Sequence, residues 1–151
     1  MKVSKLLKLH GMLLLTMHPD FTLAEAARRF SQPVGGRRFS LALVTDHDDR
    51  LVGVISLGDI AHALGDHEER AASLLVKDIM TTEVVSCSLD DSLEDVLKTM
   101  AEKGIRHTPV IEGGKLAGLV ARRDALEFLY QQASLDAAHL TDWLFRSDAR
   151  Y

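Results

Sequence analysis

The sequence predicts an α/β (α+β) fold in which two tandem β-α-β-β-α repeats pack sheet to sheet with pseudo-two-fold symmetry. The first observation behind this prediction is a repeated element. Residues 51–60 and 116–125 each read as a short apolar strand with a glycine near its start and an aspartate six residues after that glycine. The second observation is that both copies have a hydroxyl residue and an acid at the start of an upstream helix. One such unit cannot bury its apolar face alone, whereas two copies can cover each other.

The first copy begins its main helix with a capping box. The Thr22 hydroxyl is placed to accept from the amide of Glu25, and the Glu25 carboxylate to accept from the amide of Thr22. The elements expected in this copy are a lead-in helix over 3–10, a strand over 13–17, a helix over 22–30, a strand over 39–44, a hairpin over 45–49, and a strand from 51 that leads into a closing helix.

The second copy repeats this order with clear end signals. Ser92 and Asp95 open the helix, and Gly104 follows it as expected of a residue just past a helix end. The paired glycines at 113–114 suit a tight turn with positive φ. The elements expected here are a lead-in helix over 72–80, a strand over 84–87, a helix over 92–103, a strand over 105–111, and a strand from 116 that leads into the last helix.

The first copy is longer than the second. Thr22 matches Ser92 at an offset of 70, whereas Gly53 matches Gly118 at an offset of 65, so the first copy holds five extra residues. Most of them are expected in the loop 31–38, and the rest in the hairpin that follows.

The repeat predicts four segments: a first repeat over 1–66, a linker over 67–72, a second repeat over 73–130 and a helical tail over 131–151. In the tail, apolar residues recur at roughly helical spacing after a polar joint at 131–134. They are Leu135, Leu140, Trp143 and Leu144. This pattern fits a helix that packs back on the repeats, and it equally fits a dimer contact, because tryptophan is enriched at interface cores.

Composition excludes several classes of protein. The formal net charge of −4 argues against nucleic-acid binding by bulk charge. The apolar runs near the N-terminus are far shorter than the ~20 residues that span a bilayer, and no secretory signal is evident, which predicts a cytoplasmic protein with no membrane partner. The single cysteine, Cys87, excludes an internal disulfide and is expected to be a core residue.

The second copy resembles a CBS (cystathionine-β-synthase) domain. The similarity rests on residues 76–81 (Val-Lys-Asp-Ile-Met-Thr), on 105–110 (Ile-Arg-His-Thr-Pro-Val), and on 116–118 (Leu-Ala-Gly) with Asp124. The first copy resembles a more divergent CBS repeat, most clearly over 53–60. Together they resemble a stand-alone CBS pair, or Bateman module. The resemblance implies a homodimeric regulatory sensor that binds AMP, ADP, ATP, NAD or S-adenosylmethionine between the repeats.

The first candidate ligand site lies at the repeated element of the first copy. Gly53 has no Cβ and permits close approach, the Ser56 hydroxyl can donate to a phosphate, and the Asp59 carboxylate can accept from both hydroxyls of a ribose. The resemblance implies the same roles and adds Leu13 and Leu14 as apolar walls for adenine. The alternative is that Ser56 and Asp59 only cap a helix.

The second candidate site keeps the glycine and the acid but has Ala121 in place of the hydroxyl. Arg122 and Arg123 are candidate replacement donors, and the alternative is that they only form a solvated helix start. The site is therefore expected to bind with a different preference, or to be empty. Its expected residues are Thr82, Val84, Val85, Arg106, His107, Pro109, Gly118, Arg122, Arg123 and Asp124.

Three functions remain open at this point. The first is an adenosine-nucleotide-binding regulatory module that acts on a partner in trans. The second is a structural dimerisation or protein-interaction module with vestigial clefts. The third is an enzyme, which the absence of a recognisable catalytic motif makes the weakest. No cofactor or metal is expected, because the acidic segment 46–49 lacks the ligand spacing of a calcium loop and reads as an exposed hairpin.

Overall fold

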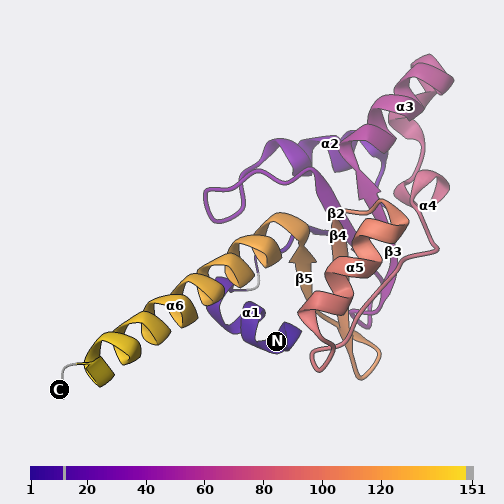
Figure 1. The fold of residues 1–151 in the computed structure, drawn as a ribbon. Helices are drawn as coiled ribbons and strands as arrows, with labels where there is room; N and C mark the ends of the chain where they lie inside the picture. The colour runs from indigo at the N-terminus through magenta and orange to yellow at the C-terminus, as the bar shows by residue number, and fades with distance from the viewer. Residues whose placement is uncertain (12, 149–151) are drawn as a thin grey trace.

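The computed structural model describes the backbone of residues 1–11 and 13–148, and the side chains of residues 1–11 and 13–139. Helices and strands alternate as two repeats, which confirms the predicted α/β (α+β) fold (Figure 1). The elements are α1 (Val3–His10), β1 (Thr16–Met17), α2 (Leu23–Ser31), β2 (Leu41–Thr45), β3 (Leu51–Ser56), α3 (Leu57–His67), the 3-10 helix η1 (Glu68–Ser73), α4 (Val76–Ile79), α5 (Leu93–Lys103), β4 (His107–Glu112), β5 (Lys115–Ala121) and α6 (Arg122–Asp148).

Two small sheets form the centre of the molecule. In the first sheet, β1 pairs parallel with β2, and β2 pairs antiparallel with β3. The second sheet is the antiparallel pair β4–β5. The strand expected over 84–87 is reduced to one parallel bridge between Cys87 and Val110, because only Cys87 exchanges backbone hydrogen bonds with β4. The prediction of a full strand there is wrong.

The predicted start of α2, the end of α5 and the turn between β4 and β5 are confirmed. Thr22 and Glu25 form the reciprocal capping box at the start of α2. Gly104 ends α5 in the left-handed conformation with φ 65°. Gly113 and Gly114 join β4 to β5 with φ 56° and 78°. These signals are local, so each could be read from a few adjacent residues.

The segment between the repeats differs from the expectation of a short polar linker. Helix α3 continues through Gly65 to His67, and η1 follows it directly. An interior glycine costs a helix about 1 kcal/mol, which tertiary packing can offset. The lead-in helix expected over 72–80 shortens to α4, whose only buried residue is Val76.

The two lead-in helices cross over. Val3, Leu6 and Leu7 of α1 are buried in the core of the second repeat, together with Leu93 and others. In return, Val76 of α4 is buried in the core of the first repeat. The helix that precedes the first repeat therefore completes the core of the second repeat, and the helix that precedes the second repeat completes the core of the first.

Backbone hydrogen bonds hold α1 against the second repeat. The amide of Val3 donates to the carbonyl of Asp91 at 3.0 Å, and the amide of Leu93 donates to the carbonyl of Met1 at 2.7 Å. Side chains reinforce this junction, because the Lys2 ammonium lies 2.8 Å from the Asp90 carboxylate.

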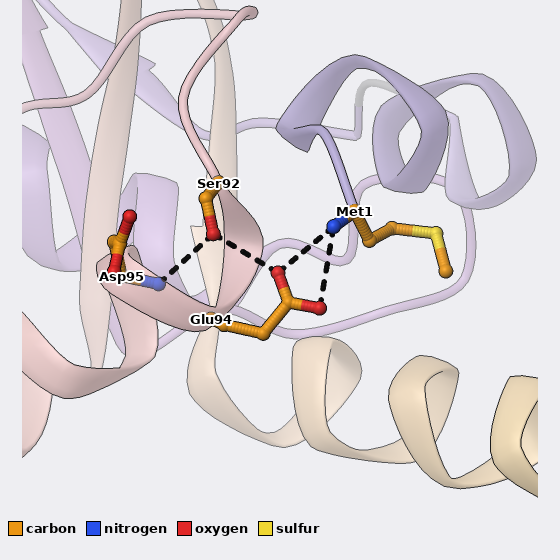
Figure 2. A network of polar contacts seen from close by, with 4 residues as sticks. All are labelled: Met1, Ser92, Glu94 and Asp95. Atoms are coloured by element: carbon orange, nitrogen blue, oxygen red, sulfur yellow. Dashed lines mark hydrogen bonds and ion pairs between the residues drawn. The ribbon is translucent and has the colours of Figure 1, made fainter.

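A polar network continues the same junction at the start of α5 (Figure 2). The Met1 ammonium donates to both carboxylate oxygens of Glu94, at 3.0 and 3.2 Å. The Ser92 hydroxyl donates to Glu94 at 3.0 Å and accepts from the amide of Asp95 at 3.3 Å. The ammonium group holds the pKa of Glu94 below its usual value.

The junction of α4 with the first repeat repeats this pattern. The amide of Val76 donates to the carbonyl of Phe21, and the amide of Leu23 donates to the carbonyl of Leu74, both at 2.8 Å. The Lys77 ammonium lies 2.8 Å from the Asp20 carboxylate. The matching hydrogen bonds at the two junctions follow the predicted pseudo-two-fold symmetry.

Close packing of the crossing segment explains why β3 contains a glycine. A Cβ on Gly53 would lie 2.7 Å from the Met80 sulfur and 2.8 Å from the Thr81 carbonyl oxygen. That carbonyl accepts from the amide of Val54 at 2.9 Å, so it cannot move away without losing the bond. Gly118 has the same role beside Leu7, whose Cδ1 would be 2.7 Å from a Cβ.

We expect Gly53→Ala to lower the free energy of unfolding by about 1–3 kcal/mol, as overpacking does. Urea unfolding of the purified variant measures this change. Gly65→Ala is the matched control, because nothing lies within 4 Å of its Cβ position. Since Gly65 lies inside α3, that change is expected to be neutral or to stabilise by about 0.5–1 kcal/mol. Equal effects of the two substitutions would contradict the packing role.

Candidate functional site

A cavity of about 250 Å³ lies between α1, the segment that enters β2, and the start of α6. Both repeats contribute to it, so it is a cleft of the pair and not of one copy. Its lining residues are Leu6, Leu7, His10, Gly11, Leu13, Arg37, Arg38, Phe39, Ser40, Leu41, His107, Leu119, Ala121, Arg123 and Asp124.

Asp124 and His107 form the polar end of this cavity. Asp124 lies in the first turn of α6, where the helix dipole favours a negative charge. His107 is placed opposite Ala121 by the β4–β5 register. Burial lowers the pKa of His107, although the nearby Asp124 carboxylate opposes that shift. Within the described residues, the Asp124 carboxylate accepts no side-chain hydrogen bond, which leaves it available to a ligand.

Three arginines belong to the lining of the cavity. Arg37 and Arg38 come from the loop before β2, and Arg123 comes from the start of α6. All three side chains are exposed. None of them forms an ion pair or a side-chain hydrogen bond with another described residue. With one carboxylate, Asp124, among them, the cavity favours an anion.

The polar side chains of the first motif bind each other's backbone. The amide of Ser56 donates to the Asp59 carboxylate at 2.7 Å, and the amide of Asp59 donates to the Ser56 hydroxyl at 3.1 Å. This is a capping box at the start of α3, the alternative that the sequence left open. Neither residue lines any of the four cavities described here.

The wall residues that were expected beside each motif lie beside the other motif in the structure. Leu13, expected beside Asp59, lines the cavity of Asp124. Thr82 and Val84, expected beside Asp124, line a separate cavity of about 190 Å³ with Gly53. The crossing of the lead-in segments explains the exchange, because each brings its following residues to the other repeat.

The remaining expected residues lie apart from this cleft. Val85 lines a third cavity of about 140 Å³ with Cys87. Arg106 and Arg122 line a neighbouring surface pocket, to which His107 and Arg123 also contribute. Leu14 is half-buried and Pro109 is buried within β4. Gly118 contacts Leu7 of α1, as described above.

Sequence reasoning missed the contribution of Arg37, Arg38, His10 and Ser40 to this cleft. A signal was present, because the first two belong to the loop 31–38 that makes the first copy longer. Nothing in that loop resembles a known binding motif, and its place beside Asp124 depends on how the two repeats pack.

The acidic hairpin at 46–49 and the single cysteine both have structural roles. The Asp46 carboxylate accepts from the amides of Asp48 and Arg50 at 2.9 and 3.0 Å, which stabilises the hairpin. Among the side chains of residues 1–11 and 13–139, no group of three or more His, Cys, Asp or Glu is arranged to hold a metal ion. Burial raises the pKa of the Cys87 thiol to about 11, as in an unreactive core cysteine.

The comparison with protein families identifies the fold. The family model for the CBS domain matches residues 14–66 and 76–131. The chain therefore belongs to the CBS domain family, with two copies that form a CBS pair.

Curated relatives agree with this assignment. Protein MJ1232 of Methanocaldococcus jannaschii is 31% identical over 115 residues, which are 76% of this chain and 36% of that protein. A protein of Acidianus ambivalens is 33% identical over 107 residues, which are 70% of this chain and 61% of that protein. The chain thus spans only about a third to three fifths of the length of these two relatives.

Solved structures share the fold. A CBS-domain protein from Agrobacterium tumefaciens matches with a TM-score of 0.73 and 27% identity, over 84% of this chain and 98% of that one. The cytosolic domain of the Mg²⁺ channel MgtE, solved with ATP, matches with a TM-score of 0.64 and 26% identity. The match covers 76% of this chain and 44% of that one. The CBS pair of MJ0100, solved with 5′-methylthioadenosine and S-adenosyl-L-methionine, matches with a TM-score of 0.70 and 22% identity. The match covers 87% of this chain and 98% of that one.

No helix in the described part of the chain is both long enough and apolar enough to cross a membrane.

Proposed function

We propose that this CBS pair is a regulatory module that binds an adenosine-containing ligand in the cleft of Asp124 and transmits the bound state to a partner protein in trans. The observation that carries the proposal is a cleft between the repeats whose lining contains one carboxylate and three arginines. None of these side chains forms a side-chain hydrogen bond with another described residue. An ionised carboxylate accepts from both hydroxyls of a ribose, and guanidinium groups bind phosphate oxygens. The cytoplasmic location stays a prediction.

The ligand class is supported by chemistry and by family membership. The apolar residues Leu6, Leu13 and Leu119 line the same cleft and offer a surface for a base. MgtE, a relative of this fold, was solved with ATP. Of the two sites predicted from the sequence, we prefer the second, because Ser56 and Asp59 of the first hydrogen-bond each other's backbone amides and line none of the four cavities described above.

Asp124→Asn is expected to weaken adenosine-ligand binding about 10- to 100-fold, because a hydrogen bond to a charged group is worth about 1.5–3 kcal/mol. Calorimetric titration with AMP, ADP, ATP, NAD and S-adenosylmethionine measures the change. Asp59→Asn is the matched control, since it makes the same substitution in the first motif. It is expected to leave the affinity within about threefold of the parent value. The reverse ranking of the two variants would move the site to the first motif.

A second candidate function is a structural dimerisation or protein-interaction module with vestigial clefts. It is favoured by α6, where Leu126, Tyr130 and Leu135 are 53%, 75% and 53% exposed. Helix α6 also extends well beyond the rest of the protein (Figure 1). A dimer by light scattering, together with no binding of any adenosine compound, would favour this function over the first.

A further inference from the structure

We propose that the Asp124 cleft selects adenosine di- and triphosphates over AMP and over the cationic S-adenosylmethionine, and that Arg37 and Arg38 make this selection. The inference rests on the proposed function and specifies its ligand class.

The two arginines are presented by a rigid turn. The amide of Val34 donates to the carbonyl of Arg37 at 2.8 Å, and the amide of Arg37 donates back to Val34 at 3.1 Å. Gly35 and Gly36 between them have φ 56° and 76°, as a tight hairpin turn with two left-handed residues requires. The backbone at Arg37 is therefore ordered before any ligand binds.

The turn is also fixed against the cleft wall. A Cβ on Gly35 would lie 2.8 Å from Cδ2 of Leu13, a residue that lines the cavity. The glycine thus allows the turn to rest directly on Leu13. As a result, the turn lies against a residue of the cavity wall, and Arg37 and Arg38, which follow the turn, belong to the same lining. Preorganisation of this kind lowers the entropy cost of binding.

The three guanidinium groups of the cleft offer more hydrogen-bond donors than one phosphate group needs. Arg37, Arg38 and Arg123 carry three positive charges against the single carboxylate of Asp124, a net charge of about +2. Burial lowers the pKa of His107, which disfavours a further positive charge there. A monophosphate carries about −1.5 to −2 charges at neutral pH. The net charge alone is therefore balanced by AMP, and the selection rests on the number of guanidinium groups. Each guanidinium can bind a phosphate group through two hydrogen bonds, so three arginines can contact more phosphate groups than AMP carries. Their positive charge also repels a sulfonium cation.

The size of the cavity is also consistent with an adenosine di- or triphosphate as the ligand. Its volume of about 250 Å³ is just below the range of about 300–1,000 Å³ typical of ligand pockets. In the proposed arrangement a nucleoside occupies the cavity, and its phosphates lie against the exposed arginines of the lining.

Calorimetric titration of the parent chain with adenosine, AMP, ADP, ATP and S-adenosylmethionine tests the selection. We expect ATP to bind at least tenfold more tightly than AMP, and S-adenosylmethionine more weakly than both. In Arg37→Gln/Arg38→Gln, ATP affinity is expected to fall at least tenfold while AMP affinity changes less than threefold. Arg28→Gln/Arg70→Gln removes the same charge from exposed positions outside the cavity, and is expected to leave both affinities unchanged.

The outcomes separate this inference from the proposed function. Equal affinities for AMP and ATP in the parent chain, or equal losses of both in the arginine variant, would overturn the selection while adenosine binding stands. A similar loss of ATP affinity in the control variant would reduce the effect to net charge and would also overturn it. No binding of any adenosine compound would overturn the proposed function itself.

Discussion

Leu6→Ala is expected to lower the free energy of unfolding by about 2–5 kcal/mol, the cost of truncating a buried leucine. Leu6 is only 2% exposed and lies in the core of the second repeat, although it belongs to the first helix of the chain. Urea unfolding followed by circular dichroism measures the change. Leu9→Ala is the matched control, because Leu9 is in the same helix but 65% exposed, and its loss is expected to cost little.

The location of the damage tests the crossing of the lead-in helices. In Leu6→Ala, amide hydrogen exchange is expected to rise more in α5, β4 and β5 than in β2 and β3, because local stability follows the weakened core. Faster exchange confined to β2 and β3 would mean that α1 packs on the first repeat. Equal stability losses for Leu6→Ala and Leu9→Ala would mean that α1 is not held in a core.

Phe128→Ala is expected to cost about 3–5 kcal/mol, the largest loss that a single core truncation here should produce. The Phe128 ring is 2% exposed and makes an edge contact with His10, at 6.3 Å between ring centroids and 84° between planes. It thus joins the start of α6 to the end of α1, both of which border the Asp124 cleft. Thermal and urea unfolding measure the loss.

The control for Phe128→Ala is the neighbouring aromatic residue. Tyr130 lies in the same helix and is 75% exposed, so Tyr130→Ala is expected to change the free energy of unfolding by less than about 0.5 kcal/mol. Because His10 lines the cleft, Phe128→Ala is also expected to weaken ligand binding, whereas Tyr130→Ala is not. A stable, fully binding Phe128→Ala variant would show that α6 is not anchored by this ring.

Local sequence signals predicted the elements well but could not predict their partners. The capping residues Thr22 and Ser92 and the turn glycines at 113–114 each act within a few residues, so their effects could be read directly. The apolar residues of α1 predicted a helix with a buried face. They contained no information on which repeat would receive that face, because both cores are apolar.

The two motif glycines illustrate the same limit. A glycine before a helix start is expected wherever a ligand or another backbone comes close. At Gly53 the close neighbours are Met80 and Thr81, and at Gly118 the neighbour is Leu7. The sequence pattern is the same for a ligand and for a protein segment, so the exchange of the apolar walls could not be foreseen.

The position of α1 has a consequence for synthesis of the chain. Leu7 and Phe128 share one core but are 121 positions apart, so the helix emerges from the ribosome long before its binding partners exist. At typical translation speeds of about 5–20 residues per second, the wait is roughly 6–24 s. During that time Val3, Leu6 and Leu7 have no core to enter. The nascent chain is therefore the state in which capture by a chaperone, or aggregation, competes most strongly with folding.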